Sequence, residues 1–457
     1  MMGERGRDVA LVLGGSMAGL LAAKTLSETF SEVLVVDRDE LSGVRGPRRG
    51  VPHGRHAHGL LARGQQILQN EFPGLTEELI EAGVETGDFN GDIRWILNGQ
   101  RLRPAHAGLA CVPATRPVLE YHIRKRVEAL PNVSFRERRD IVGLVASSDG
   151  RRVTGARVHG DSAETLSADL VIDATGRASR TPVWLEELGY ERPPEEKVKI
   201  GLAYTTRHFQ LKSDPFGGDL AIIPVATPSH PRGAFFYKLP GGGGRIELSL
   251  TGILGDYPPT DPDGFLEFTR TLPVPDIYQA VCDAEPLDEA VSFRFPASVR
   301  RRYERMARFP EGLLVMGDAA SSFNPVYGQG MTTAALEMLT LRRHLEQDGL
   351  PRPRRFFNDI ARDINAPWDF SSGADLGYPE VEGRRTPKIR MANAYIARLH
   401  AAAVHDSALT TAFIRAAGLI DTPQALMRPS VMLRVARNMW RPAGAAPSSA
   451  SREAVTK

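Results

Sequence analysis

The stretch that decides the fold reads Val9-Ala10-Leu11-Val12-Leu13-Gly14-Gly15-Ser16-Met17-Ala18-Gly19-Leu20-Leu21-Ala22-Ala23. An apolar run of strand length leads into a turn of small residues and then into a small-residue helical pattern. This order is that of the dinucleotide-binding fingerprint Gly-x-Gly-x-x-Gly, with Ser16 in place of the second Gly. The first Gly permits the sharp turn, the second lets the backbone approach a diphosphate, and the third lets helix and strand pack closely. The free N–H groups of the helix N-terminus then face the diphosphate.

A second apolar strand ends in the acid that this fingerprint requires. Residues 32–36 have the pattern of a buried strand, and Asp37 follows 18 residues after Gly19. The fingerprint places an acid roughly 20 residues downstream, where its carboxylate bonds the ribose hydroxyls. The alternative is a Gly-rich turn of an ordinary parallel α/β protein, which has no need of an acid in this register. The sequence therefore predicts a site for an adenine dinucleotide.

Length and composition set the broad class of the protein. The chain has 457 residues, which predicts two or three domains, and its 42% hydrophobic and 25% charged content is typical of soluble globular proteins. A formal net charge of +2 gives no electrostatic reason to expect nucleic acid as a partner. Only Cys111 and Cys282 occur, without a Cys-x-x-Cys pair, which favours a reducing, cytoplasmic location. No apolar stretch reaches 18 residues, so no transmembrane segment is expected.

A loop rich in Gly, Pro, Arg and His follows the second strand, over residues 43–58. His56 and His58 are two residues apart, but no carboxylate or Cys stands at metal-ligand spacing, so no metal site is predicted. Two interpretations stay open for this loop. It either wraps an anionic cofactor, with its histidines near the reacting group, or it is plain surface.

The pattern changes to short β-strands from about residue 198 to 254. Ile246, Leu248 and Leu250 alternate with polar Glu247 and Ser249, which predicts a half-buried antiparallel strand. The run 241–244 lies between two strands and precedes no helix, so it is interpreted as a hairpin loop, and Asn98-Gly99 predicts another hairpin. These strands predict a sheet inserted into the nucleotide-binding domain.

A second cofactor-facing turn follows roughly 300 residues after the fingerprint. A buried strand over 312–315 leads to Gly317-Asp318, and a helix begins near Gly330. A nicotinamide dehydrogenase has no evident use for such a turn, whereas FAD extends far beyond its diphosphate. Asp318 is a candidate for the ribityl hydroxyls, and the helix N-terminus would face the flavin pyrimidine edge, where reduction places negative charge. A strand-loop-helix crossover with incidental Gly and Asp is the alternative.

With these motifs in place, the chain resembles the FAD-dependent monooxygenases of the aromatic-hydroxylase type. Within that family the segments 49–58 and 324–331 most resemble the flavin epoxidases of polyether antibiotic biosynthesis. The resemblance covers about the first 380 residues. It departs from the family at Ser16 and at Asp173-Ala174-Thr175-Gly176, which stands where the hydroxylases have Asp-Gly. The cofactor-binding residues that the resemblance and the motifs together predict are Gly14, Gly15, Ser16, Met17, Ala18, Gly19, Asp37, Arg38, Arg48, Arg116, Gly176, Asp318, Pro325, Gly328, Gly330 and Met331.

The resemblance implies an α/β fold: a Rossmann-like FAD-binding domain with an inserted, mostly antiparallel β-sheet substrate domain and a helical C-terminal region. The expected FAD-binding domain comprises residues 1–90, 111–197 and 296–380. The expected substrate domain comprises a hairpin at 91–110 and the sheet at 198–295. A helical region over 381–443 and a disordered tail over 444–457 complete the prediction.

The implied activity is insertion of one oxygen atom from O2, through a flavin C4a-hydroperoxide, into a hydrophobic, natural-product-like substrate, with alkene epoxidation favoured. Aromatic hydroxylation, double-bond reduction of the geranylgeranyl-reductase kind and a non-enzymatic flavin sensor are the alternatives. NAD(P)H is the expected reductant, acting directly or through a separate flavin reductase, and no catalytic acid or base is predicted. Phe235, Phe236 and Tyr237 are candidates for an apolar wall over the flavin. The basic segment 427–441 favours a packed terminal helix over a membrane-binding or partner-binding segment.

Overall fold

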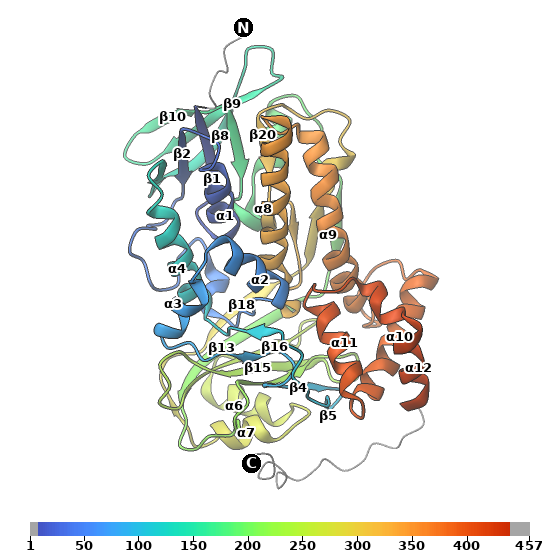
Figure 1. Cartoon of the computed structure of the whole chain (residues 1–457). Helices are drawn as coiled ribbons and strands as arrows, with labels where there is room; N and C mark the ends of the chain where they lie inside the picture. The colour runs from blue at the N-terminus through green and yellow to red at the C-terminus, as the bar shows by residue number, and fades with distance from the viewer. Residues whose placement is uncertain (1–7, 439–457) are drawn as a thin grey trace.

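The computed structural model describes residues 8–438, and a five-stranded parallel sheet lies in the upper half of the view in Figure 1. Its order is β20 (Leu313–Val315), β11 (Leu170–Asp173), β1 (Val9–Leu13), β2 (Glu32–Val36) and β7 (Val133–Arg136). The register pairs Leu13 with Asp173 and Asp173 with Val315, so the carboxyl ends of three strands lie side by side. The three strands are almost entirely buried, which explains their continuous apolar sequences. This arrangement confirms the predicted Rossmann-like α/β core.

Helices and a second sheet cover this core. Helix α1 packs against α4 and α8, and α8 packs in turn against α2 and α9. A three-stranded antiparallel sheet of β8, β9 and β10 packs against β11 and β1. The bounds of these elements are α1 (Met17–Leu26), α2 (Ala62–Glu71), α3 (Leu75–Glu81), α4 (Arg116–Glu128), α5 (Thr181–Glu187), α8 (Gln329–Asp348), α9 (Pro353–Asp375), β8 (Asp140–Ala146), β9 (Val153–His159) and β10 (Ala163–Ser167).

An eight-stranded sheet lies beyond the carboxyl ends of the parallel strands (Figure 1). Its pairs are antiparallel, except that β14 and β4 are parallel. Asn98 and Gly99 join β4 to β5 with φ of 50° and 73°, the left-handed geometry of a two-residue hairpin, as the sequence predicted. The strands of this sheet are β4 (Ile93–Leu97), β5 (Gln100–Arg101), β13 (Leu202–Gln210), β14 (Ala221–Val225), β15 (Arg232–Lys238), β16 (Arg245–Gly252), β17 (Glu285–Pro286) and β18 (Val291–Phe295).

Strand β16 differs from the half-buried strand that its alternation predicted. Glu247 and Ser249, on its polar face, are only 3% and 0% exposed. The loop after residue 55 crosses this face, and the backbone N–H of Ala57 donates a hydrogen bond of 3.0 Å to Oγ of Ser249. The alternation is therefore right, but the expectation of a solvent-facing side is wrong because another segment covers it.

Helices α6 (Pro262–Arg270) and α7 (Asp276–Val281) cover the opposite face of this sheet. Phe236 lies on that face, fully buried, with its ring 4.9 Å from the ring of Phe216. Phe235 and Tyr237 belong to the face toward the parallel sheet, since successive strand residues alternate. The expected apolar wall therefore does not include Phe236.

The C-terminal helices pack against the β4–β5 hairpin. Helices α10 (Pro387–Ala403), α11 (Ser407–Ala417) and α12 (Pro429–Asn438) share an apolar core with Leu97 and Leu102 of the hairpin. Asn438 is the last described residue, so the end of the expected terminal helix and the expected disordered tail at 444–457 lie outside the described residues. None of the helices in residues 8–438 is both long enough and apolar enough to span a bilayer.

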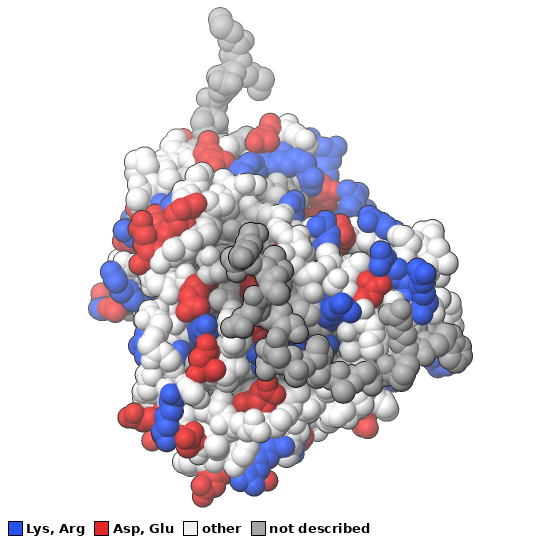
Figure 2. Space-filling view, turned by 60° about the horizontal axis from the view of Figure 1, so that its bottom comes forward, with Lys and Arg blue, Asp and Glu red and all other residues white. Residues whose placement is uncertain are grey.

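Short elements connect these parts. Lys, Arg, Asp and Glu are interspersed over the face shown in Figure 2, in keeping with the small net charge. The remaining elements are β3 (Gly87–Asp88), β6 (Ala110–Cys111), β12 (Glu195–Val198), β19 (Ser298–Arg301), β21 (Ser321–Ser322), η1 (Pro52–Arg55), η2 (Gly176–Ala178), η3 (Tyr303–Arg305), η4 (Gly317–Ala319), η5 (Pro325–Tyr327) and η6 (Pro423–Met427).

Candidate functional site

Three loops from distant parts of the chain meet at the carboxyl ends of β1, β11 and β20. Gly14 has φ of +102°, and a Cβ there would lie 2.5 Å from the carbonyl oxygen of Ala174. Gly317 has φ of +62°, and a Cβ there would lie 2.6 Å from the Cβ of Ala18. These close approaches require Gly at both positions. The fold thus brings the fingerprint turn against the Gly317-Asp318 turn, as the sequence predicted.

The N-terminus of α1 has the geometry of a diphosphate site. A Cβ on Gly19 would lie 1.7 Å from the carbonyl oxygen of Gly14, so only Gly allows this close packing of helix and turn. Ser16 is the N-cap residue, yet its side chain makes no capping bond to the first-turn N–H groups. These N–H groups and the partial positive charge of the helix end suit an anion.

Ser16, the departure from the fingerprint, takes part in a buried polar network. Its Oγ donates to Oε2 of Glu120 (3.0 Å) and accepts from Nη2 of Arg116 (2.9 Å). The hydroxyl therefore links the turn to the start of α4. The second Gly of the fingerprint would not make these bonds.

Replacing Ser16 by Gly is therefore expected to destabilise the protein although it restores the fingerprint. The two lost hydrogen bonds lower the free energy of unfolding by about 1 kcal/mol, because they leave Arg116 and Glu120 short of a partner. Ser16→Thr, which keeps a hydroxyl, is the control and is expected to lose less. Urea unfolding at pH 7 measures both. A Ser16→Gly variant as stable as the parent would show that the network contributes nothing.

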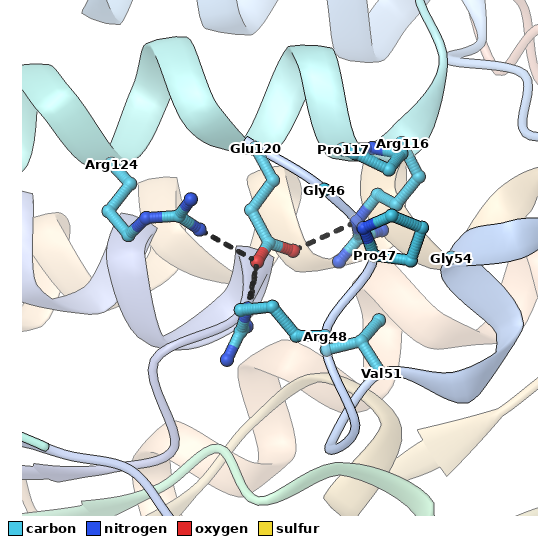
Figure 3. Close-up of a pocket in the computed structure, with 9 residues that line it drawn as sticks. All are labelled: Gly46, Pro47, Arg48, Val51, Gly54, Arg116, Pro117, Glu120 and Arg124. Carbon is cyan, nitrogen blue, oxygen red and sulfur yellow. Dashed lines mark hydrogen bonds and ion pairs between the residues drawn. The ribbon is translucent and has the colours of Figure 1, made fainter. Parts of the chain in front are cut away.

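Three arginines surround Glu120 beside the fingerprint turn (Figure 3). Glu120 accepts from Nη2 of Arg48 (2.7 Å), from Nε of Arg116 (3.0 Å) and from Nη1 of Arg124 (3.2 Å). Burial alone would raise the pKa of Glu120, but the charges of Arg116 and Arg48 outweigh burial and lower this pKa to about 2. These side chains line a pocket of about 10 Å³, room for about one water molecule.

Asp37 lies at the end of β2, next to the fingerprint turn. Its Oδ2 accepts from the backbone N–H of Gly15 (2.7 Å), and its Oδ1 lies 3.4 Å from Nη1 of Arg48. Arg38 is exposed beside it. The structure thus brings Asp37, Arg38 and Arg48 together with the turn.

Asp318 and the start of α8 form the other end of the candidate site. Asp318 is half-buried, and its carboxylate makes no hydrogen bond within residues 8–438. Burial raises the pKa of Asp318, while the charges of Arg116, Arg177 and Arg301 oppose that shift. A Cβ on Gly330 would lie 3.5 Å from Oδ1 of Asp318, so the two segments adjoin.

Gln329, at the start of α8, is a candidate that the sequence reasoning did not single out. It is 1% exposed, yet neither Oε1 nor Nε2 has a hydrogen-bond partner among the described residues. An unpaired buried amide is costly, so a ligand with a donor and an acceptor fits beside it. Its position between Gly328 and Gly330 is the sequence feature that could have identified it as a site residue. The predicted residues Pro325, Gly328 and Met331 lie on the same segment.

Asp173 organises its own loop. It is fully buried and accepts hydrogen bonds from the hydroxyls of Thr175 (2.6 Å), Ser179 (2.5 Å) and Thr181 (2.6 Å). Gly176 follows with φ of +80° and open space where a Cβ would point. The segment Asp173-Ala174-Thr175-Gly176, which replaces the Asp-Gly of the hydroxylases, thus places a residue without a side chain, Gly176, beside the turn at residues 14–19.

The loop over residues 43–58, the histidine loop, lies between α4 and the large sheet. The rings of His53 and His56 lie 6.0 and 5.7 Å from the ring of Phe293 on β18, and the ring of His56 lies 6.0 Å from that of Tyr204 on β13. Burial lowers the pKa of His53 to about 3 and that of His56 to about 4, and it places the pKa of His58 well below its ordinary value. These rings are therefore neutral at pH 7. No cluster of three potential metal ligands occurs within residues 8–438.

A buried acid, Asp375 at the end of α9, holds the loop before α8. Its Oδ1 accepts from Nδ2 of Asn324 (2.8 Å) and from the hydroxyl of Tyr327 (3.0 Å). Burial raises the pKa of Asp375 to about 7, against the lowering effect of both hydrogen bonds. Sequence reasoning missed this acid because nothing in the α9 pattern distinguishes it from a surface residue.

Replacing Asp375 by Asn is expected to stabilise the protein, relative to the parent, more at pH 8 than at pH 5. Above the unfolded pKa of about 3.8 the unfolded chain ionises first, so the parent loses stability until the pH passes about 7. The amide keeps both acceptor bonds and does not titrate. The difference in unfolding free energy between variant and parent should grow by about 2.6 kcal/mol from pH 5 to pH 8 in urea titrations. Asp369→Asn, at an exposed position of α9, should show no such growth. An unchanged difference for Asp375→Asn would contradict the raised pKa.

Comparisons with known proteins agree with this geometry. Residues 7–347 match the family model described as "FAD binding domain". Protein Rv3254 of Mycobacterium tuberculosis is 33% identical over 450 residues, which cover 93% of this chain and 92% of that protein. Kynurenine 3-monooxygenase of Salinispora arenicola is 26% identical, covering 74% of this chain and 72% of that protein. Digeranylgeranylglycerophospholipid reductase 2 of Methanopyrus kandleri is also 26% identical, covering 71% of this chain and 73% of that protein.

Solved structures share the fold. The p-nitrophenol 4-monooxygenase PnpA from Pseudomonas putida superposes with a TM-score of 0.61 at 15% identity, covering 91% of this chain and 98% of that one. The flavin-dependent brominase Bmp2 superposes with a TM-score of 0.60 at 14% identity, covering 95% and 93%. At such identities the likeness concerns the fold alone. From the match over residues 7–347, the chain belongs to the FAD-binding domain family, and FAD is its cofactor.

Proposed function

We propose that this chain is an FAD-dependent monooxygenase that transfers one oxygen atom of O2 to a hydrophobic small molecule, with alkene epoxidation as the favoured reaction. We infer the hydrophobic substrate class from the apolar cluster between the large sheet, the start of α2 and α11. Its half-buried aromatic side chains are Trp95, Phe235 and Phe413. Where these side chains line the substrate site, they would favour a substrate without charge.

The residues present fit an extended FAD molecule. Asp37, Arg38 and Arg48 would hold the adenosine end. The diphosphate would lie at residues 14–19 and Arg116, since the N-terminus of α1 offers free N–H groups there. Gly176 would leave room for it. Asp318, whose carboxylate makes no hydrogen bond within the described residues, would bind ribityl hydroxyls. The flavin ring would then reach residues 325–331, where the unpaired amide of Gln329 supports this placement.

The chain's own contribution is binding, charge stabilisation and exclusion of water. The bound flavin, once reduced by NAD(P)H directly or through a separate reductase, supplies the activated oxygen. The N-terminus of α8 would stabilise negative charge on the ring edge. Phe235 and Phe293 would keep water from that ring. Neutral His53 and His56 add no charge to this environment.

Two relatives support alternative reactions. The 26% identity to kynurenine 3-monooxygenase favours aromatic hydroxylation as the second candidate. The equal identity to digeranylgeranylglycerophospholipid reductase 2 supports reduction of an isoprenoid double bond as the third. The first two reactions consume dioxygen and the third does not.

The deciding experiment supplies the FAD-loaded protein with NADPH, with a flavin reductase added in a parallel reaction, and with alkene and phenol probes under ¹⁸O₂. A product of the alkene heavier by one ¹⁸O atom supports epoxidation, and a labelled catechol supports hydroxylation. A product heavier by two hydrogen atoms, formed equally without oxygen, would overturn the monooxygenase proposal. Hydrogen peroxide release without a labelled product from any probe would also count against it.

A further inference from the structure

A row of polar side chains, joined by hydrogen bonds and ion pairs, runs along one face of the large sheet from a buried position to solvent. His56 Nδ1 lies 2.8 Å from Oγ1 of Thr206, which lies 2.5 Å from Oγ of Ser249. Ser249 donates to Oε1 of Glu247 (3.1 Å). Oε2 of Glu247 lies 3.4 Å from Nε2 of His208, whose Nδ1 lies 2.5 Å from Oδ2 of Asp288.

The register of β13 and β16 produces this row. Thr206 pairs with Ser249, and His208 pairs with Glu247, as direct cross-strand neighbours. Residues two apart on a strand share a face, so all four side chains project from the same side of the sheet. The same side carries Tyr204 and contacts the histidine loop. A polar stripe of this kind, buried where apolar residues would pack better, is costly unless it is fully paired.

The two ends of the row lie in different environments. His56 is 4% exposed, and its Nε2 makes no hydrogen bond to any residue of the described chain. At the other end the side chains of His208 and Asp288 are 29% and 41% exposed. Hydrogen bonding to Glu247 raises the pKa of His208 to about 9, whereas burial lowers that of His56 to about 4. At pH 7 the outer histidine is thus charged and the inner one is neutral.

Other titratable groups surround the row. The charge of Arg55 acts on His56, and His56 in turn acts on the rings of His53 and His58. Tyr237 on β15 lies beside Glu247, and burial keeps its pKa well above the ordinary value, so it stays neutral. Arg207 donates to the backbone carbonyl of Asp288 at the surface. These neighbours leave one carboxylate, Glu247, between the two histidines.

We propose that the row from Asp288 to His56 is a proton path that joins bulk water to the buried part of this sheet face, where FAD would lie. The inference rests on the proposed placement of FAD but not on the oxygenation chemistry. Monooxygenation with NAD(P)H consumes one proton per turnover, because O2, a hydride and a proton together yield the inserted oxygen atom and one water. That proton has to reach a site from which water is excluded.

The transfer balances along the named atoms. Charged His208 passes its Nε2 proton to Glu247 and keeps the proton on Nδ1. Its part-exposed ring then turns over, so that the bare nitrogen faces Asp288 and takes up a proton from water there. When the hydroxyl of Ser249 is turned toward Thr206, protonated Glu247 passes a proton to Oγ of Ser249, and the hydroxyl protons of Ser249 and Thr206 each move one place inward. The hydrogen bond from Ser249 to Glu247 in the structure corresponds to the state after this transfer. Nδ1 of His56 receives the last of these while its Nε2 releases a proton on the FAD side. One proton enters and one leaves. The hydroxyls then turn back and the ring of His56 turns over, so that a bare nitrogen again faces Thr206.

The test follows a proton transfer that needs no turnover. The oxidised FAD-loaded protein is jumped to alkaline pH in a stopped-flow spectrometer, and ionisation of the flavin ring N–H is followed by absorbance. Thr206→Val, which interrupts the row without changing its volume, should slow this ionisation at least tenfold. Thr206→Ser is the matched control and should stay within twofold of the parent. FAD affinity and the final spectrum should be unchanged in both.

A second variant tests the outer end. His208→Ala should slow the ionisation, and added imidazole should restore the rate, because a small buffer replaces the missing carrier. A Thr206→Val protein as fast as the parent, equal slowing by Val and Ser, or no rescue by imidazole would overturn the path. A protein that binds FAD but forms no oxygenated product still permits this measurement. Failure of the path and failure of the proposed function are therefore distinguishable.

Discussion

Replacing Gly19 by Ala is expected to weaken FAD binding at least 100-fold. A Cβ at this position would lie 1.7 Å from the carbonyl oxygen of Gly14 and 2.9 Å from its carbonyl carbon. Both atoms belong to the backbone of the fingerprint turn, so no side-chain rotation relieves the clash, and the turn has to move away from α1. A 100-fold loss corresponds to about 2.7 kcal/mol of binding free energy. Titration of the apoprotein with FAD, followed by flavin fluorescence, measures the affinity.

The control for this prediction is Gly373→Ala in α9. A Cβ there would meet no atom within 4 Å, and Ala is favoured over Gly within a helix, so FAD affinity should not change. If the Gly19→Ala variant does not fold, Gly317→Ala serves instead. Its Cβ would lie 2.6 Å from the side chain of Ala18, on the opposite wall of the same junction. Unchanged FAD affinity in a folded protein with Ala at either position would place the cofactor elsewhere.

The sequence allowed the parallel core to be predicted because both motifs are local. The turn at residues 14–19 needs Gly for steric reasons that a single short stretch reveals, and the acid at position 37 confirms its register. The second turn at Gly317-Asp318 could be assigned to the same site because FAD is longer than the fingerprint alone accounts for. Its contact with Ala18 then followed from the adjacent order of β1, β11 and β20.

The features that the sequence did not predict depend on packing between segments that lie far apart in the chain. Ser249 and Glu247 alternate with apolar residues as in a solvent-facing strand, but a loop almost 200 positions earlier in the chain covers them. Asp375 resembles any polar helical residue until α9 brings it under the 324–327 loop. Gln329 lay inside a recognised motif, yet only the absence of a partner among the described residues distinguishes its amide. Burial of polar groups by distant segments leaves no local pattern.

The sequence also did not reveal that Arg48, assigned to the cofactor site, pairs with a buried carboxylate. The loop composition suggested an anion-binding arginine, and the structure places its guanidinium against Glu120 as well as Asp37. Arg116, chosen from the family motif, also pairs with Glu120. Both arginines therefore have a structural partner in addition to any role toward FAD. The contribution of Glu120 to the free energy of unfolding can be measured directly.

Replacing Glu120 by Gln is expected to lower the free energy of unfolding at pH 7 by about 3–5 kcal/mol. Glu120 is 4% exposed, and its carboxylate is the closest anion to three buried or nearly buried arginines, Arg48, Arg116 and Arg124. Neutralising it leaves their charges desolvated and close together, and breaking a buried ion pair from one side costs this much. Urea unfolding at pH 7 measures the loss.

The pH dependence of the stability difference between parent and Glu120→Gln provides a second test. The three arginines hold the pKa of Glu120 near 2 against the effect of burial, below its ordinary value of 4.5. The stabilisation by the carboxylate is therefore fully present above about pH 4.5 and is lost as the pH falls toward 2. The stability difference between parent and Glu120→Gln should be constant from pH 5 to pH 7 and should shrink at pH 3. Glu128→Gln, at an exposed position of the same helix, should change stability by less than about 0.5 kcal/mol at every pH. A Glu120→Gln variant that loses less than this control would show that the arginines find their counter-charge elsewhere, in Asp37 and Asp39.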